Sequence, residues 1–156
     1  MKKSAGILFY HFNNQIPEVF LVHPGGPFWK NKDKGSWSIP KGEFTEDELP
    51  LDAAIREVKE ETGLTCNGTF IELSTLKQKS GKLVYAWALE KEIDPAQITS
   101  NTFEMEWPPR SGQFKQFPEV DKASWFTISE ARQRINSGQE GFIDELLNKL
   151  NIPLRN

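Results

Sequence analysis

The sequence predicts a mixed α/β fold, either α/β or α+β, formed by a single domain over residues 1–156. The first observation is the order of patterns: strand-like segments stand on both sides of a central helical segment, and two further helical segments follow. The second is composition, because 37% of the residues are hydrophobic and eleven are phenylalanine. A chain of this length buries roughly 70% of its unfolded surface, which is enough for one core.

The first third of the chain has the composition of β-strands. Residues 5–10 and 19–22 are rich in β-branched, aromatic and aliphatic side chains, and the asparagines at 13–14 favour a turn between them. The loop GGPFWKNKDKG follows at 25–35, before a short apolar stretch at 37–39. We therefore expect two strands joined by a turn, and then a long loop.

A helix is expected from about residue 50 to residue 61. Pro50 suits the first helical position, where its missing N–H costs nothing, and Gly63 suits the C-terminal cap. Thr45 and Glu48 have the spacing of a capping box, but a helix that began there would enclose Pro50. The later start is therefore preferred.

The rest of the chain contains a second pair of strands and two helices. Residues 69–78 and 83–89 have strand character around the turn at 80–82. Amphipathic patterns at 129–136 and 141–150 predict the closing helices.

Charge and cysteine content exclude several kinds of protein. The formal net charge is −3, which is too close to neutral to favour bulk binding of nucleic acid or of a membrane surface. Cys66 is the only cysteine, so the chain has no internal disulfide and no thiolate cluster for zinc. The apolar run after the N-terminal lysines is too short for a signal peptide or a membrane span. We expect a soluble, cytoplasmic protein.

The central helix carries an unusual group of carboxylates. At 100° per residue, Glu57, Glu60 and Glu61 share one arc, with the small residue Ala53 between them. A neighbouring arc is apolar and predicts the core face: Leu51, Ala54, Ile55 and Val58.

A solvated acidic face is one interpretation of this arc, but surface helices usually interleave charges of both signs. The helix macrodipole also disfavours anions near the C-terminus, although Arg56 can pair with Glu60 four residues on. A divalent cation among the carboxylates would make the cluster favourable, and hard oxygen ligands suit Mg²⁺ or Mn²⁺.

The segment GEFTEDELPLDAAIREVKEETGL, residues 42–64, resembles the Nudix box, G-x5-E-x7-R-E-U-x-E-E-x-G-U with U aliphatic. All nine specified positions match: Gly42, Glu48, Arg56, Glu57, Val58, Glu60, Glu61, Gly63 and Leu64. The flanks WSIPKGE at 37–43 and PEVDKASWFTISEA at 118–131 also resemble the family, so the resemblance spans most of the chain.

The resemblance implies an α/β/α sandwich with a mixed sheet, and hydrolysis of a nucleoside diphosphate linked to another group X. It implies that Glu57, Glu60 and Glu61, with the Gly42 carbonyl, hold Mg²⁺ or Mn²⁺. Arg56 would orient a glutamate, and Glu48 and Gly63 would support the motif. The general base is left open between Glu57 and a glutamate outside the box, and a metal-bound water is a further source of hydroxide.

Several residues outside the box are candidates for the substrate site, each with a plainer alternative. Lys41 and Arg110 could meet phosphates or simply be solvated. Glu104 and Glu106 share one side of an expected strand and could face the site or the solvent. Glu119 could complete the metal site or have a structural role beside Trp125. Trp29, Phe28 and Trp107 lie in or next to loops, where they could stack on a base or pack against neighbours.

The resemblance implies a small-molecule nucleotide as substrate. Lys79 occupies the position where ADP-ribose-type relatives carry proline, which weakens that assignment. The stretch at 37–42 resembles hydrolases of diadenosine polyphosphates and diphosphoinositol polyphosphates, and SNTFEMEWPPRSG at 100–112 resembles bacterial predicted NTP pyrophosphohydrolases. A nucleoside or dinucleoside polyphosphate is therefore expected.

The alternative is a non-catalytic sensor of nucleotide or RNA with the same fold. A sensor would be expected to have lost box carboxylates, and Glu57, Glu60 and Glu61 are all present. Dimers occur among related folds, and the sequence does not decide the oligomeric state.

Overall fold

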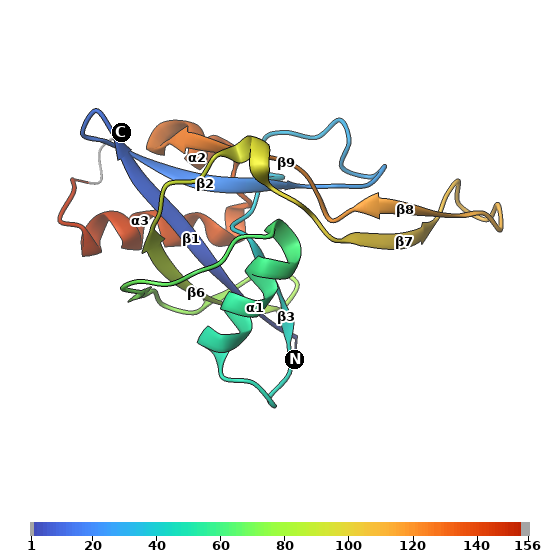
Figure 1. The fold of residues 1–156 in the computed structure, drawn as a ribbon, viewed down its shortest axis with the longest axis horizontal. Coiled ribbons are helices and arrows are strands. Elements are labelled where there is room, and N and C mark those ends of the chain that lie inside the picture. Colours follow the sequence, from blue (N-terminus) through green and yellow to red (C-terminus); the bar gives the residue numbers. More distant parts are fainter. Residues whose placement is uncertain (1, 154–156) are drawn as a thin grey trace.

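The computed structural model describes residues 2–153, which centre on one mixed β-sheet (Figure 1). Its strands are β1 (Lys3–Asn13), β2 (Ile16–Pro24), β3 (Lys41–Phe44), β4 (Ile71–Glu72), β5 (Leu76–Lys77), β6 (Leu83–Glu90) and β9 (Val120–Thr127). They run in the order β4-β6-β1-β2-β9, with β3 paired to β1 and β5 to β6. β1 and β6 are parallel and the other pairs are antiparallel, so the sheet is mixed as predicted.

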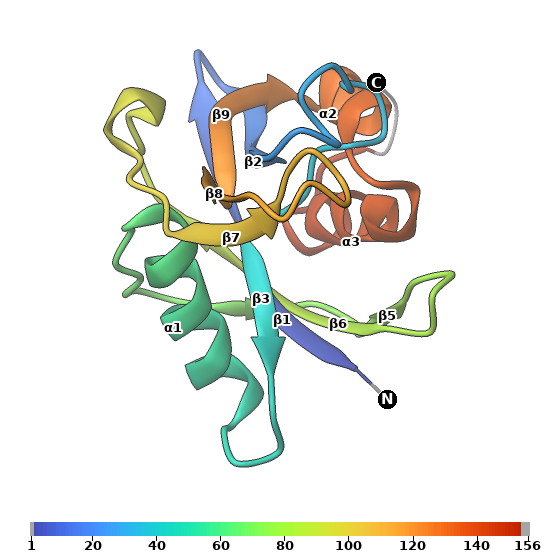
Figure 2. The same ribbon diagram turned by 90° about the vertical axis from the view of Figure 1, so that its right-hand side faces the viewer.

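Helices cover both faces of this sheet (Figure 2). They are α1 (Pro50–Thr62) on one face, and α2 (Ile128–Arg134) and α3 (Glu140–Lys149) on the other, with short 3₁₀ turns η1 (Pro95–Gln97) and η2 (Ser137–Gln139). Alternation along β1 divides the core, because Ile7 and Phe9 pack with α1 whereas Leu8 and Tyr10 pack with α3. The predicted α/β/α sandwich is confirmed.

Helix α1 begins and ends where the sequence predicts. Pro50 is its first residue, and Gly63 terminates it in the left-handed conformation, φ 79°, with its N–H bonded to the carbonyl of Lys59 at 2.8 Å. Ala53 lies between Glu57 and Glu60 on the acidic arc, as expected, and this small residue marks the part of the arc that is buried. Ala53 is fully buried beside Ala54 and Val58, because the small alanines let α1 approach the sheet closely.

The single strand expected at 69–78 is wrong, since it forms two short strands, β4 and β5. Between them Leu73 turns into the core, and both the N–H and the hydroxyl of Ser74 donate to the Glu145 carboxylate on α3. The chain leaves the ladder here because it makes these tertiary contacts instead.

A separate hairpin of β7 (Thr102–Glu106) and β8 (Phe114–Pro118) projects from the body of the molecule (Figure 1). It joins η1 to β9, and Pro118 at its base is followed directly by Glu119. Within the described residues, no helix is long and apolar enough to cross a membrane.

Candidate active site

The acidic arc of α1 lies against the edge of β3 that is not paired with β1. The N–H of Lys41 on that edge donates to Glu61 Oε1 at 3.1 Å. At the next residue, Gly42, a Cβ would overlap the Glu57 carboxylate, so only glycine lets helix and strand come this close. The first position of the box must therefore be glycine, because the Glu57 side chain packs directly against it.

Arg56 ties three glutamates together. Its Nε and Nη2 donate to the two oxygens of Glu48 at 2.7 and 2.6 Å, a bidentate pair. Its Nη1 donates to Glu57 Oε1 at 2.8 Å and to Glu60 Oε2 at 3.1 Å. The hydrogen bonds from Arg56 hold the pKa of Glu48 below its usual value. Arg56 thus positions two box carboxylates and is itself anchored by the third.

The carboxylates that meet at this edge repel one another in a partly buried setting. Burial raises the pKa of Glu57 and of Glu61, and neighbouring carboxylates raise both further; bonds from Arg56 and from the Lys41 N–H offset part of the effect. Burial and the charge of Glu60 raise the pKa of Glu119, which lies just past β8. Glu119 therefore belongs to the same electrostatic cluster as the box glutamates.

This donor set suits a hard divalent cation. Carboxylate and carbonyl oxygens are the ligands that Mg²⁺ and Mn²⁺ prefer, and a cation would relieve the repulsion that raises these pKa values. Among residues 2–153, no three acidic, histidine or cysteine side chains lie close enough together to enclose an ion. Glu57 and Glu60 both accept hydrogen bonds from Arg56 instead. The cluster fits a metal in the chemistry of its donors, although two of its carboxylates face Arg56.

Comparison with known families decides the assignment. A family model described as the NUDIX domain matches residues 2–146. The chain belongs to the Nudix family.

Curated relatives share parts of this Nudix chain. Nudix hydrolase 5 of Arabidopsis thaliana is 26% identical over 129 residues, which cover 82% of this chain and 38% of that protein. RNA pyrophosphohydrolase of Xanthomonas campestris pv. campestris is 35% identical over 54 residues, covering 34% of this chain and 26% of that protein. The matches thus span well under two thirds of the length of these relatives.

Solved structures share the Nudix fold along almost the whole chain. The Caenorhabditis elegans Ap4A hydrolase binary complex has a TM-score of 0.64 at 20% identity, covering 97% of this chain and 98% of that one. The NUDIX domain of Shewanella oneidensis NrtR complexed with ADP ribose has a TM-score of 0.63 at 15% identity. The match covers 95% of this chain and 87% of that one. These likenesses show the fold.

The predicted site residues divide into those beside the box and those away from it. Lys41 is half-buried next to Glu61, and burial lowers its pKa, so it is not a freely solvated lysine. Arg110 lies in the loop that joins β7 to β8, with a positive φ of 62°, and this hairpin projects from the body of the molecule (Figure 1). Glu104 is exposed, and the Glu106 carboxylate accepts from the N–H groups of Arg110 and Gly112 within the same hairpin tip.

The aromatic candidates lie on the loop at 25–35 and the hairpin. Trp29 is 40% exposed, with Lys32 Nζ 5.2 Å from its ring centroid, and Phe28 packs edge-to-face on Trp107 at 5.7 Å. The contact between Phe28 and Trp107 joins the loop to the hairpin. Sequence reasoning gave no role to Glu43, inside the box, or to Lys82, outside it, and these two residues pair at 3.1 Å. Only the strand register, with β3 and β6 on either side of β1, brings them together.

Proposed function

We propose that this protein hydrolyses a phosphoanhydride bond in a nucleoside or dinucleoside polyphosphate, with Mg²⁺ or Mn²⁺ as its cofactor. The observation that carries the proposal is the cluster of Glu57, Glu60, Glu61 and Glu119 at the edge of β3. Relatives named for RNA pyrophosphohydrolase and Ap4A hydrolase activity support the substrate class.

Each residue has a distinct part in this proposal. Glu57, Glu60 and Glu61, with the carbonyl of Gly42, would hold the metal, which when bound neutralises phosphate oxygens and lowers the pKa of water. Arg56 keeps two of these carboxylates in place and does not itself touch substrate. Lys41, half-buried at the same edge, supplies positive charge to a phosphate.

Two glutamates are candidates for the general base. Glu57 is in the box, and Glu119 approaches from outside it. Burial raises the pKa of both, which makes each a stronger base than an exposed glutamate. Glu119 has backbone bonds to two other segments, since its N–H donates to Asn101 and its carbonyl accepts from Gly25. These bonds fix the backbone of Glu119, whose charge raises the pKa of Glu57 and of Glu61 on α1.

The experiment is phosphate release from nucleoside triphosphates, dinucleoside polyphosphates, ADP-ribose, NADH and a diphosphoinositol phosphate, with Mg²⁺ or Mn²⁺. Glu60→Gln and Glu61→Gln are compared with Glu72→Gln, an exposed glutamate on β4. We expect turnover of a polyphosphate that both box variants lose and the Glu72 variant retains. Binding of one compound without turnover would favour the sensor, and turnover that survives both box substitutions would reject the proposed mechanism.

A further inference from the structure

A pocket of about 390 Å³ lies where the loop at 25–35 meets strand β9 and helix α2. Its wall includes Trp37 and Phe126, which belong to the core layer that α2 and α3 cover. Helix α1, which carries the box carboxylates, covers the opposite face of the sheet (Figure 2). The other lining residues are polar or charged: Lys30, Asn31, Lys32, Asp33, Lys122, Ser124 and Arg134. We call this the loop pocket.

Three separate elements bring these side chains together. Lys122, Ser124 and Phe126 alternate along β9, so their side chains point to the same face of the sheet. Trp37 packs edge-to-face on Phe126, with 4.9 Å between the ring centroids. Arg134, the last residue of α2, reaches the same wall, where its guanidinium lies 5.0 Å from the centroid of the Phe126 ring.

Aromatic rings hold two cations of the loop pocket in place. Lys122 Nζ lies 5.7 Å from the centroid of the Trp37 ring, and Arg134 lies over Phe126. Cation–π contacts of this kind restrict the rotamers of long side chains. An anion that binds here therefore costs less side-chain entropy than one that must order freely moving lysines.

Positive charge exceeds negative charge in the loop pocket. Its lining contains four cations and one carboxylate, an excess of three positive charges: Lys30, Lys32, Lys122, Arg134 and Asp33. Trp37 Nε1 donates to Asp33 Oδ1 at 2.7 Å, and Arg134 Nε lies 3.3 Å from the same oxygen, so this carboxylate is already engaged. Within residues 2–153 the three lysines form no salt bridge. The whole chain has a formal net charge of −3, so this excess is a local feature.

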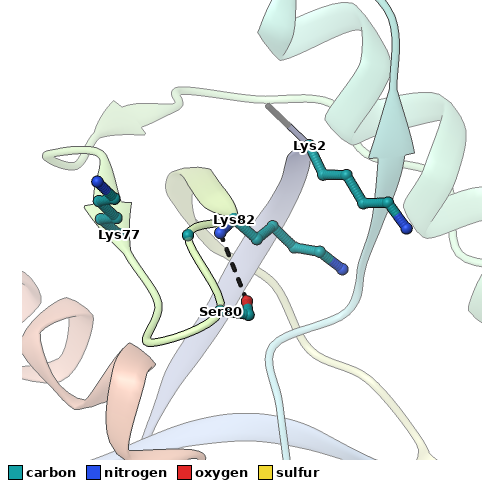
Figure 3. Close-up of a pocket in the computed structure, with 5 residues that line it drawn as sticks. Lys2, Lys77, Ser80 and Lys82 are labelled. Atoms are coloured by element: carbon teal, nitrogen blue, oxygen red, sulfur yellow. Dashed lines mark hydrogen bonds between the residues drawn. The ribbon is translucent and has the colours of Figure 1, made fainter.

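A second lysine-lined pocket, of about 600 Å³ beside the N-terminal end of β1, provides a comparison (Figure 3). Its cations are Lys2, Lys77 and Lys82, and Figure 3 shows Lys77 standing apart from the other two. Lys82 pairs with Glu43 at 3.1 Å. In the part of the chain that the structure describes, none of these three lysines lies over an aromatic ring. The loop pocket is therefore the better organised of the two for an anion.

We propose that the loop pocket is a second phosphate site, apart from the carboxylate cluster, which binds a diphosphate group either as free pyrophosphate or as part of a nucleotide. Its volume is in the range of small-molecule sites. Arg134 and the lysines donate charge-assisted hydrogen bonds to phosphate oxygens. Because the cations come from the loop, β9 and α2, two linked phosphates meet more of them than a single phosphate does. This binding needs no metal, so it is independent of the proposed hydrolysis.

The test is calorimetric binding of pyrophosphate to metal-free protein. The double variant Lys30→Gln/Lys122→Gln should weaken binding by about tenfold, because two cations of the pocket are lost. Asp33→Asn should tighten binding, since it removes the competing charge while its amide oxygen still accepts from Trp37. The matched control is Lys77→Gln/Lys79→Gln, which removes two charges from exposed side chains elsewhere and should change the Kd by less than about twofold.

NMR titration of the same protein locates the site. Pyrophosphate should shift the indole N–H signal of Trp37 and the backbone amides of Lys122 and Ser124, and leave those of α1 in place. A nucleoside diphosphate is titrated in parallel: equal affinities assign the pocket to any diphosphate group, and a response to pyrophosphate alone assigns it to the free anion.

Three results would overturn the proposal. The first is a double variant that binds pyrophosphate as tightly as its matched control does. The second is a set of shifts confined to α1 and β3, which would place the anion at the carboxylate cluster. The third is orthophosphate binding as tightly as pyrophosphate, which would remove the preference for two linked phosphates.

Discussion

The α1–β3 edge and the β7–β8 hairpin both carry charged residues that the sequence marks as candidates, but the two regions hold them differently. At α1 the carboxylates are partly buried and bond to groups on other elements, as Glu61 does to Lys41. In the hairpin, Glu106 bonds the backbone of Arg110 and Gly112, four and six residues along the chain. Burying carboxylates that repel one another costs free energy, which a bound cation would offset. The hydrogen bonds in the hairpin only stabilise a turn.

Arg56→Ala should produce the largest effect on the α1 side. It removes the contacts that orient Glu57 and Glu60, and misplacement of catalytic groups by about 1 Å can cost on the order of 100-fold in rate. Steady-state kinetics with the best substrate of the panel measures the loss, which should fall mainly on kcat.

Arg56→Lys is the matched variant, because a point charge cannot replace the planar fork that bonds Glu48 and Glu57 together. It should recover only part of the activity. Full activity in Arg56→Lys would show that charge alone matters and that the positioning role is wrong.

Metal should stabilise the α1 side and leave the hairpin unchanged. A cation at about 100 times its Kd adds roughly 2.7 kcal/mol to the free energy of unfolding, several degrees in Tm for a domain of this size. Differential scanning fluorimetry with Mg²⁺ and after chelation measures the shift. Glu61→Gln should reduce it and Glu72→Gln should retain it; equal shifts in both variants would place the metal elsewhere.

The two regions also differ in how far the sequence predicts them. The box motif, the limits of α1 and the Arg56–Glu60 pair follow from helical spacing and capping, because these interactions are local along the chain. The burial of Ala53 and the contribution of Glu119 depend on how separate elements pack, which spacing does not encode. The same holds for the break between β4 and β5, which a contact with Glu145 on α3 causes.

Glu106→Ala should have a smaller effect, confined to the hairpin. The substitution removes two hydrogen bonds from backbone N–H groups, so the free energy of local opening should fall by about 1 kcal/mol. Hydrogen exchange of the amides of Arg110 and Gly112 measures this directly. Turnover should stay within about twofold, since the bonds lie in the projecting tip. A loss of kcat comparable to that of Glu61→Gln would contradict this expectation and assign Glu106 to the active site.

Arg110→Ala should have the smallest effect of all. Its side chain starts from a turn residue at the hairpin tip, which projects away from α1 (Figure 1). Arg110 is exposed, and solvent-exposed charges are largely screened from groups beyond the Debye length, about 8 Å at physiological ionic strength. KM and kcat should therefore match the wild type within error at 0.15 M salt. A rise in KM that shrinks as salt is added would mean that the hairpin closes over the substrate, and the contrast between a functional edge and a structural hairpin would then fail.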